Sequence, residues 1–416
     1  MIPSRKKQTV KRVFNQEIMH LEQLSLSNFR NFARLDLPVP KGSILIAGRN
    51  AQGKTSLLEA IYFLATLSSF HAENDRQLVN FLEARKPLAV ARIQANYLRA
   101  GRKHQLEVRI IKEQSRNGVE RARKEILLDG AKKKRAEVIG HFNAVLFLPQ
   151  MLQIVDGSPS FRRRYLDLAL AQSQAGYAET LSEYEGIVSQ RNALLKQLSE
   201  GRGDREQLDF WDDRLSQRGA QVLHARFQAI QELDILAGKL HQSLTRGKEV
   251  LRLDYRPAYD PLPSPDKQMQ LMADPRDRSG LSLEAIQSGL LSELISQREE
   301  QIARRITTIG PHRDELRFLG NGVDLGSFGS RGQIRTALLS LKLAELDWMQ
   351  ARSGHKAILL LDEVMAELDE KRRGDLLSHS ASYEQMLITT ADISDFSEDF
   401  LGDAQLWTIE DGRLKS

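Results

Sequence analysis

Residues 48–55 read GRNAQGKT, which is the spacing of a phosphate-binding loop, G-x-x-x-x-G-K-[ST]. An apolar run at 44–47 precedes it and a segment with helical apolar spacing, 56–64, follows it, so the motif has the required strand–loop–helix setting. The two glycines let backbone N–H groups face phosphate oxygens at a helix N-terminus. Lys54 is expected to act on the β- and γ-phosphates and Thr55 to hold Mg²⁺. We predict that a nucleoside triphosphate contacts the whole loop: Gly48, Arg49, Asn50, Ala51, Gln52, Gly53, Lys54, Thr55 and Ser56.

The second part of the predicted nucleotide site is acidic and lies far along the chain. Residues 358–361 are apolar and lead directly into Asp362 and Glu363, the pattern of a Walker B strand. Asp362 is expected to complete the Mg²⁺ shell, and Glu363 to orient or deprotonate the attacking water. Because 308 residues separate Lys54 from Asp362, we expect a large insertion between the two halves of one nucleotide-binding core.

The composition is that of a globular protein with one unusual end. Of the 416 residues, 41% are hydrophobic and 28% charged, and no cysteine is present, which excludes disulfides and thiolate metal sites. No apolar run is long enough to span a membrane. The pI of about 9.2 overstates the basic character of the body, because residues 1–18 carry a net charge of +4 out of a total of +5. We expect this tail to be disordered, and nucleic-acid contacts to depend on local clusters.

Periodicity divides the chain into three parts. Alternating strands are expected at 20–26, 33–37, 88–97, 105–111, 125–128 and 144–148. Beyond Pro149 the spacing predicts two antiparallel helices at 181–198 and 210–233, a proline-rich linker at 257–275, and a helix at 283–306. A hairpin around 320–322, a helix at 334–350 and a strand at 386–390 follow. We therefore predict an α/β head in two parts, 19–150 and 301–416, interrupted by a mainly helical arm at 151–300.

Ser330, Gly332 and Gln333 lie at the start of the helix expected at 334–350, shortly before the Walker B strand. A helix N-terminus suits an anion, here a γ-phosphate, although a plain helix cap explains the same residues equally well. In this position the segment resembles the signature loop of the ATP-binding-cassette superfamily, which reaches ATP held by a second subunit. By the same resemblance Asp369 occupies the D-loop and Thr390 the switch position.

Five motifs in order give a closer resemblance. They are SNFRNF at 27–32, GSPxxRR at 157–163, GPHRDE at 310–315, SxGQxRT at 330–336 and LLDE with a later Asp at 360–369. Together they span residues 21 to about 392 and resemble the RecF group of bacterial DNA-repair ATPases. The resemblance implies an α/β fold, an ATP-binding-cassette (SMC/Rad50-like) ATPase head with an inserted helical arm. It also implies nucleotide contacts from Arg30, Ser330, Gly332, Gln333, Asp369 and Thr390.

The same resemblance implies a function in DNA replication, recombinational repair and the SOS response. The chain is expected to form an ATP-dependent homodimer with Mg²⁺, to bind double-stranded and gapped DNA, and to be a weak, DNA-stimulated ATPase. It is expected to work with RecR and RecO in RecA loading, in the cytoplasm at the nucleoid. Two positions depart from the group: His71 stands where Arg is frequent, and Gln150 where an acidic pair is common. Gln150 is a candidate catalytic residue that senses Mg²⁺, with a capping or surface role equally open.

Basic clusters provide candidate DNA contacts. Lys132, Lys133, Lys134 and Arg135 form one run, Arg121 and Arg123 lie just before it, and residues 162–164 are three arginines in a row. Because aromatic residues make up only 6% of the chain, phosphate contacts with little sequence preference are favoured over base stacking. Charge runs are also often simply solvated, and that reading stays open for each cluster.

Two other functions use the same nucleotide motifs. A transporter ATPase subunit is disfavoured by the SNFRNF start and by the large helical insertion. A Rad50-like nuclease-associated ATPase remains the main alternative, but that group carries a much longer coiled coil than the short helices and the proline-rich 257–275 segment predict here.

Overall fold

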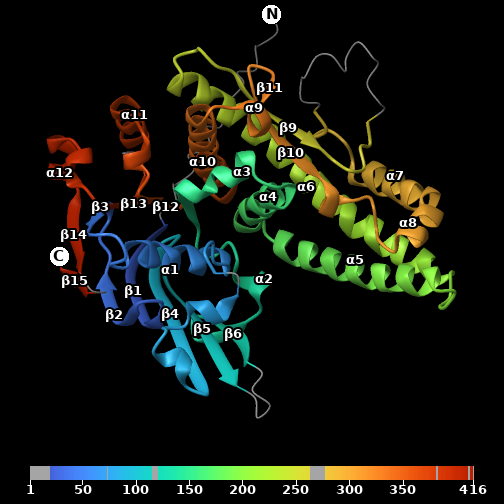
Figure 1. Cartoon of the computed structure of the whole chain (residues 1–416), viewed down its shortest axis with the longest axis horizontal. Helices are drawn as coiled ribbons and strands as arrows, with labels where there is room; N and C mark the ends of the chain where they lie inside the picture. The colour runs from blue at the N-terminus through green and yellow to red at the C-terminus, as the bar shows by residue number, and fades with distance from the viewer. Residues whose placement is uncertain are drawn as a thin grey trace, which may run out of the picture.

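The computed structural model describes residues 19–72, 74–114, 120–262, 277–380, 383–410 and 413–415. The tail at 1–18 and most of the segment expected as a linker at 257–275 lie outside the described residues. Two sheets and the helices around them form a head, from which a helical arm extends to the right in Figure 1. The described part of the chain has no helix with the length and apolar character needed to cross a bilayer.

The first sheet is antiparallel and has the order β2-β1-β4-β5-β6-β7. Every strand expected in this region is present, and most are longer than the sequence pattern indicated. Their bounds are β1 Met19–Phe29, β2 Phe32–Pro38, β4 Leu88–Arg99, β5 Arg102–Gln114, β6 Glu120–Leu128 and β7 Ala131–Lys133. Alternating side chains such as those of Ala91, Ile93 and Ala95 are buried on one face, as a sheet with one solvated face requires.

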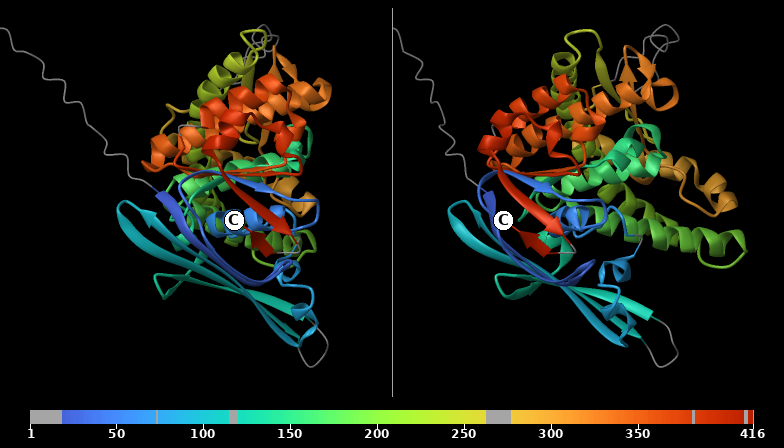
Figure 2. Two further views of the ribbon diagram at one scale, coloured as in Figure 1. Left: turned by 90° about the vertical axis from the view of Figure 1, so that its left-hand side faces the viewer. Right: turned by 60° about the vertical axis from the view of Figure 1, so that its left-hand side comes forward.

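The second sheet is mainly parallel and has the order β15-β14-β3-β13-β12-β8. Its strands are β3 Gly42–Ala47, β8 Ala144–Phe147, β12 Ile358–Asp362, β13 Gln385–Thr390, β14 Gln405–Glu410 and β15 Arg413–Lys415. Helix α1, Lys54–Thr66, is buried along most of its length and packs between the two sheets, as the two views in Figure 2 show. The carboxyl ends of β3, β12 and β13 therefore meet at one edge beside the N-terminus of α1.

The arm contains the expected pair of long antiparallel helices. Its helices are α4 Pro159–Ser173, α5 Tyr177–Ser199, α6 Gln207–Leu244, α7 Leu283–Ser296 and α8 Arg298–Arg304, so the single helix expected at 283–306 is broken at Gln297. Arg191, which interrupts the apolar stripe of α5, is fully buried. Its Nε donates to Asp212 at 2.7 Å and its Nη1 to Thr307 at 3.0 Å. This pairing satisfies a charge that would be costly to bury alone.

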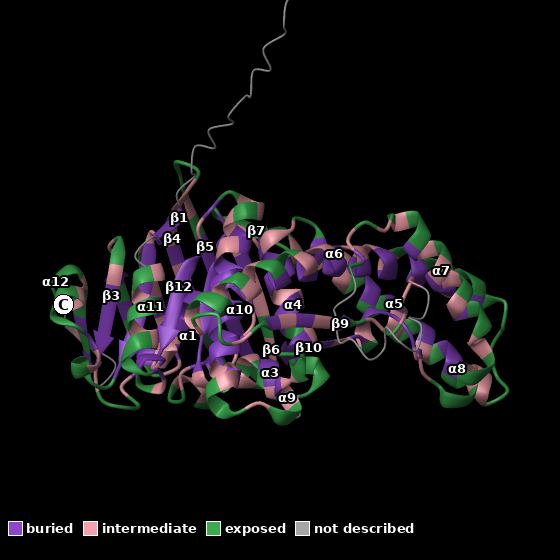
Figure 3. Cartoon of the chain, turned by 90° about the horizontal axis from the view of Figure 1, so that it is seen from above, coloured by how far each residue is buried: buried purple, intermediate pink, exposed green. Residues whose placement is uncertain are grey.

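The remaining elements join the arm to the head. A small sheet pairs β9 Leu251–Arg256, a strand that the sequence did not predict, with β10 Glu315–Gly320. Strand β10 also forms the expected hairpin with β11 Val323–Asp324. The long α6 packs both on the arm and on α10, Arg331–Ser353, a head helix that is buried along most of its length. Figure 3 shows buried residues concentrated on strands such as β12 and exposed residues at the end of the arm. The shorter helices are α2 Arg135–Val138, α3 Gln153–Asp156, α9 Leu325–Phe328, α11 Glu370–Ser380 and α12 Glu398–Asp403.

Two of the sequence motifs form this joint. Arg226 of α6 is buried and donates through Nη1 to Asp314 Oδ2 at 3.1 Å and through Nη2 to both carboxylate oxygens of Asp167 at 2.8 and 3.0 Å. Arg162 forms a two-pronged pair with Glu315 at 2.6 and 2.8 Å. The acidic partners come from 310–315 and from α4, so the GPHRDE and GSPxxRR segments connect the arm to the head through charge pairs that are buried or partly buried.

Candidate nucleotide site

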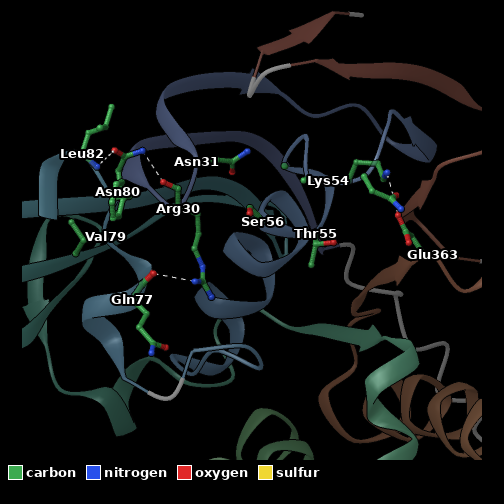
Figure 4. A pocket seen from close by; sticks show the side chains of 14 residues that line it. Arg30, Asn31, Lys54, Thr55, Ser56, Gln77, Val79, Asn80, Leu82 and Glu363 are labelled. Atoms are coloured by element: carbon green, nitrogen blue, oxygen red, sulfur yellow. Dashed lines mark hydrogen bonds and ion pairs between the residues drawn. The ribbon is translucent and has the colours of Figure 1, made fainter.

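A pocket of about 580 Å³ opens at the N-terminus of α1. Lys54, Thr55, Ser56, Asn50, Ala51 and Gly53 of the phosphate loop line one side of it, with Glu363 beside them. Figure 4 shows Lys54 and Glu363 at one end and the residues of 77–82 at the other. The predicted loop residues thus converge on one cavity, and the remaining three, Gly48, Arg49 and Gln52, lie in the turn that supports it.

The two loop glycines are required for different reasons. A Cβ at Gly48 would lie 2.6 Å from the backbone oxygen of Ile409 in β14. Gly53 has φ +112°, and a Cβ there would lie 2.4 Å from Asn31 Nδ2. The Ile409 oxygen is a backbone atom that cannot move aside for a Cβ, so close approach requires glycine at 48, whereas Gly53 is required by its positive φ, which favours glycine. The loop is therefore fixed by its neighbours in both sheets.

Lys54 is buried, and its ammonium group has three oxygen partners. Nζ donates to the backbone oxygens of Gly48 at 2.5 Å and Arg49 at 3.2 Å and lies 3.1 Å from Glu363 Oε1. Glu363 follows the last residue of β12 in the left-handed region, with φ 52°, a conformation that non-glycine residues adopt mainly where structure imposes it. The two residues predicted to act on the nucleotide are therefore in contact across the pocket.

The Thr55 hydroxyl meets the buried carboxylate of Asp362 at the end of β12. Thr55 Oγ1 donates to Asp362 Oδ2 at 2.9 Å, and Thr389 Oγ1 donates to Asp362 Oδ1 at 2.6 Å. The Thr389 hydroxyl also accepts the backbone N–H of Glu363 at 3.0 Å. Burial raises the pKa of Asp362, and the bonds from Thr389 and Thr55 oppose that rise by stabilising the carboxylate. Hard oxygen donors gathered in this way form a set that suits Mg²⁺.

Arg30 lies on the opposite side of the pocket in the turn between β1 and β2, with φ 51°. Its Nε and Nη2 donate to the two oxygens of Glu59 at 2.7 and 2.8 Å, and its Nη1 to the Gln77 backbone oxygen at 3.0 Å. Glu59 on α1 is only 1% exposed, so the pair holds the β1–β2 turn against α1. The residue predicted from the SNFRNF motif thus lies in the pocket wall.

The sequence did not predict the far wall of the pocket, which consists of Gln77, Val79, Asn80, Phe81 and Leu82. Phe81 and Leu82 are 69% and 68% exposed. Two exposed large apolar side chains next to each other in a pocket wall are a feature of sites that receive flat apolar groups. The only signal in the sequence was the Phe-Leu pair itself, which has no recognisable spacing.

Several predicted residues lie outside this pocket. Ser330 caps α10: its Oγ accepts from Gln333 N at 3.2 Å while Gln333 Oε1 accepts from Ser330 N at 3.0 Å. Gly332 follows in the first turn of α10, and no neighbour lies closer than 4.0 Å to a Cβ placed there. Asp369 pairs with Arg372 at the start of α11, with 2.6 Å between Oδ2 and Nη1. None of these residues is among those that line the pocket in the described part of the chain.

Thr390, Gln150 and His71 are also placed away from the phosphate loop pocket. The Thr390 hydroxyl donates to Asp392 O at 2.7 Å, and it is the neighbouring Thr389 that touches Asp362. Gln150 and His71 together line a smaller cavity of about 130 Å³ between the 68–71 segment, α3 and α4. His71 is nevertheless near enough to Asp362 for its positive form to lower the pKa of that carboxyl, as a minor contribution.

Most of the predicted basic clusters are partly neutralised. Lys132 pairs with Glu125 at 3.4 Å, Lys133 with Glu137 at 3.2 Å, and Arg123 with Glu125 at 2.5 Å. The remaining residues of these clusters, Arg121, Lys134 and Arg135, have no carboxylate partner within salt-bridge distance in the part of the chain that the structure describes.

This arrangement defines the class of protein. A parallel sheet that carries the phosphate loop and Asp362 at its carboxyl edge, with an antiparallel sheet across α1, is an ATP-binding-cassette ATPase head of the SMC-like type. A family model described as the RecF/RecN/SMC N terminal domain matches residues 20–400. The chain belongs to the RecF family of DNA replication and repair proteins.

Relatives match over nearly the full length. The chain is 39% identical to the DNA replication and repair protein RecF of Chloroflexus aurantiacus over 407 residues, covering 95% of this chain and 99% of that protein. It is 34% identical to the RecF protein of Enterococcus faecalis, with the same coverage. Solved structures of the recombination mediator protein RecF in the RecFOR pathway, as RecF-ATPrS and as RecF-ATP, are similar at TM-score 0.79 and 29% identity, covering 95% of this chain and 98% and 97% of those chains.

Proposed function

We propose that this chain is an ATP-dependent switch that dimerises on DNA and hydrolyses ATP in the pocket at the N-terminus of α1. The observation that carries the proposal is the meeting of Thr55, Asp362 and Thr389 beside the Lys54–Glu363 pair at one sheet edge. The similarity to RecF structures that contain ATP supports the choice of nucleotide.

Each residue of the pocket has a role in this proposal. Lys54 exchanges its contact with Glu363 for the negative charge of the phosphates, which releases the Glu363 carboxylate to orient and deprotonate the attacking water. Thr55 and Asp362 hold Mg²⁺, which neutralises charge on the phosphates when it is bound. Phe81 and Leu82 form the exposed apolar wall that the adenine base contacts. Gln150 senses this site from its margin.

A second copy of the chain completes the site. Ser330, Gly332 and Gln333 stand at the exposed N-terminus of α10 and are absent from the pocket lining of their own chain, at least among the described residues. A two-fold axis brings the same two surfaces of each copy together reciprocally. The γ-phosphate then faces the N-terminus of α10 from the partner, where free N–H groups favour an anion. Phe328, 78% exposed just before Ser330, supports an interface on this face.

Asp369 and Thr390 lie near the same edge of the sheet and belong to the proposed switch that follows hydrolysis. The dimer binds double-stranded and gapped DNA in the nucleoid, and DNA stimulates its weak ATPase. The name RecFOR pathway attached to the similar structures supports cooperation with RecR and RecO, which we propose serves RecA loading.

The proposal is tested by measuring binding to duplex, gapped and single-stranded DNA with and without ATP. Binding to gapped and duplex DNA is expected to tighten with ATP, and these DNAs are expected to stimulate ATP hydrolysis. Equal affinities for DNA with and without ATP, or a rate of ATP hydrolysis that DNA does not change, would contradict the proposed switch.

A further inference from the structure

A second large cavity, of about 560 Å³, lies where the antiparallel sheet meets the base of the arm. It is bounded by α2, α4 and α5, which lie next to one another at the corner between sheet and arm in Figure 1. Arg135, Arg163, Arg164 and Arg226 all contribute to its lining. Four arginines in one cavity, outside the nucleotide pocket, call for an explanation.

Three of these arginines have no acidic partner. Arg163 donates to the Asp314 backbone oxygen at 2.8 Å, and Arg164 to Ser68 Oγ at 2.6 Å and Ser69 O at 2.9 Å. Arg135 reaches only Thr66 O, at 3.4 Å. Among the described residues none of the three lies within 4.0 Å of a carboxylate oxygen, in contrast to Lys132 and Lys133. Their charges are therefore available to an anion.

The acidic residues in the cavity offset only part of this charge. Asp167 already accepts three bonds from Arg226 and one from Tyr177. Glu185 is the other carboxylate, and desolvation together with the Asp167 charge raises its pKa. Desolvation also lowers the pKa of Arg135, whose side chain remains solvent-accessible; the charges of Glu185 and Asp75 oppose this fall, and the charge of Arg164 adds to it. Like charges held together in this way are stabilised when an anion binds between them.

We propose that this arginine cavity, formed by Arg135, Arg163 and Arg164, binds phosphate groups of the DNA backbone. The inference rests on the proposed DNA-binding function and assigns it a site distinct from the paired lysines of β7 and its neighbours. Guanidinium groups suit phosphate because each presents several N–H donors in a fixed fork. Two aromatic rings line the cavity, Tyr184 and His312; Tyr184 is buried and the two are hydrogen-bonded to each other at 2.6 Å, so neither is a free platform for a base and recognition is of the backbone.

Hydrogen bonds connect this cavity to the nucleotide pocket. Arg164 donates to the backbone oxygen of Ser69, whose hydroxyl contacts Glu59 at 2.5 Å. Glu59 in turn receives both prongs of Arg30, which lines the nucleotide pocket. A phosphate that draws Arg164 toward itself therefore affects Arg30 at the other end of this series of hydrogen bonds. The series is a physical connection between bound DNA and the ATP site.

The test compares two double variants of the full chain that remove the same charge. In Arg135→Gln/Arg164→Gln, affinity for duplex DNA with ATP is expected to fall about 10-fold at moderate salt, and the slope of log affinity against log salt to become shallower by about 1.8. Lys132→Gln/Lys133→Gln is the matched control and is expected to stay within about 2-fold of wild type, because both lysines are already paired. Ser182→Glu, which adds a carboxylate to the cavity and removes no bond, is expected to weaken binding as well.

The outcomes separate the inference from the function on which it depends. Wild type that binds DNA, together with an unchanged affinity and salt slope in Arg135→Gln/Arg164→Gln and in Ser182→Glu, would overturn the arginine cavity alone. If inorganic phosphate raises the melting temperature of wild type but not of the arginine variant while DNA binding is equal, the cavity takes free phosphate and the assignment to DNA is wrong. Wild type that binds no DNA with ATP would overturn the proposed function itself.

Discussion

Replacing Thr389 with valine removes the hydroxyl that links the Asp362 carboxylate to the backbone N–H of Glu363. That hydroxyl donates to Asp362 Oδ1 at 2.6 Å and accepts from Glu363 N at 3.0 Å, and Thr389 is fully buried. A hydrogen bond to a charged group contributes about 1.5–3 kcal/mol. Burial raises the pKa of Asp362, and the hydrogen bond from Thr389 is the largest of the contributions that oppose this rise. Without that bond the pKa of Asp362 is expected to rise further, so the ionised carboxylate is less stable in the variant.

The consequence is a change in the pH dependence of nucleotide binding. Mg²⁺ requires the ionised Asp362, so binding of ATP with Mg²⁺ is present above the pKa of Asp362 and is lost as the pH falls through it. In Thr389→Val this loss is expected at a pH higher by about 1–2 pH units than in wild type, the equivalent of the lost bond at about 1.4 kcal/mol per unit. Thr389→Ser retains the hydroxyl and is expected to restore the wild-type profile.

The assay is a fluorescent-ATP titration with Mg²⁺ between pH 4.5 and 8, on protein that retains its circular dichroism spectrum. Thr390→Val is the matched control, because its hydroxyl bonds only within the turn to Asp392. Superimposable acid limbs for Thr389→Val and wild type, or an equal displacement in Thr390→Val, would refute the role given to the Thr389 bridge.

Three further predictions follow from individual contacts. Lys54→Met is expected to abolish ATP binding with the fold intact, and equilibrium dialysis that finds wild-type affinity would end the assignment of the loop. Arg30→Gln leaves the buried Glu59 without its two-pronged partner and is expected to lower the free energy of unfolding by about 3–5 kcal/mol. Arg34 forms an exposed ion pair, so Arg34→Gln is the control and should lower it by less than about 1 kcal/mol, both measured by thermal unfolding. Burial lowers the pKa of His312 to about 4, so the unfolded chain binds more protons than the folded chain between pH 6.5 and 4. The free energy of unfolding therefore falls as the pH is lowered through that window, by roughly 3 kcal/mol at most. His312→Gln should lose less stability than wild type between pH 7 and 5, and an equal loss would contradict a buried, neutral histidine.

The parts of the site predicted from the sequence are those with local spacing. The phosphate loop and the Walker B strand can each be recognised from fewer than ten consecutive residues. The parallel order of β3, β13 and β12 then places Thr55 next to Asp362, although the two residues are 307 positions apart in the sequence. Helices α5 and α6 were recognisable because their apolar spacing persists over several turns. The interruption of the α5 stripe by Arg191 is explained by Asp212, Gln301 and Thr307, which come from other parts of the chain.

The parts that were missed depend on register and on distant partners. Every residue of β13 is buried, so no alternation distinguishes Thr389 from Thr390, and only the pairing of Thr389 with Asp362 across the sheet makes the choice. Strand β9 lies between a long helix and a proline-rich segment and exists because β10 pairs with it. The Phe81–Leu82 wall has no periodic signal, since these residues are exposed and follow a short turn.

The measurement that tests the central claim most directly is light scattering of the full chain with saturating ATP and Mg²⁺. Glu363→Gln is expected to keep the nucleotide through Lys54 and Asp362, to lose hydrolysis, and so to accumulate as a dimer. Ser330→Arg is expected to bind ATP like wild type and to remain a monomer, because a bulky guanidinium then occupies the approach to the partner's γ-phosphate. If Glu363→Gln stays monomeric, or if Ser330→Arg dimerises as well as wild type, the site shared between two chains does not exist.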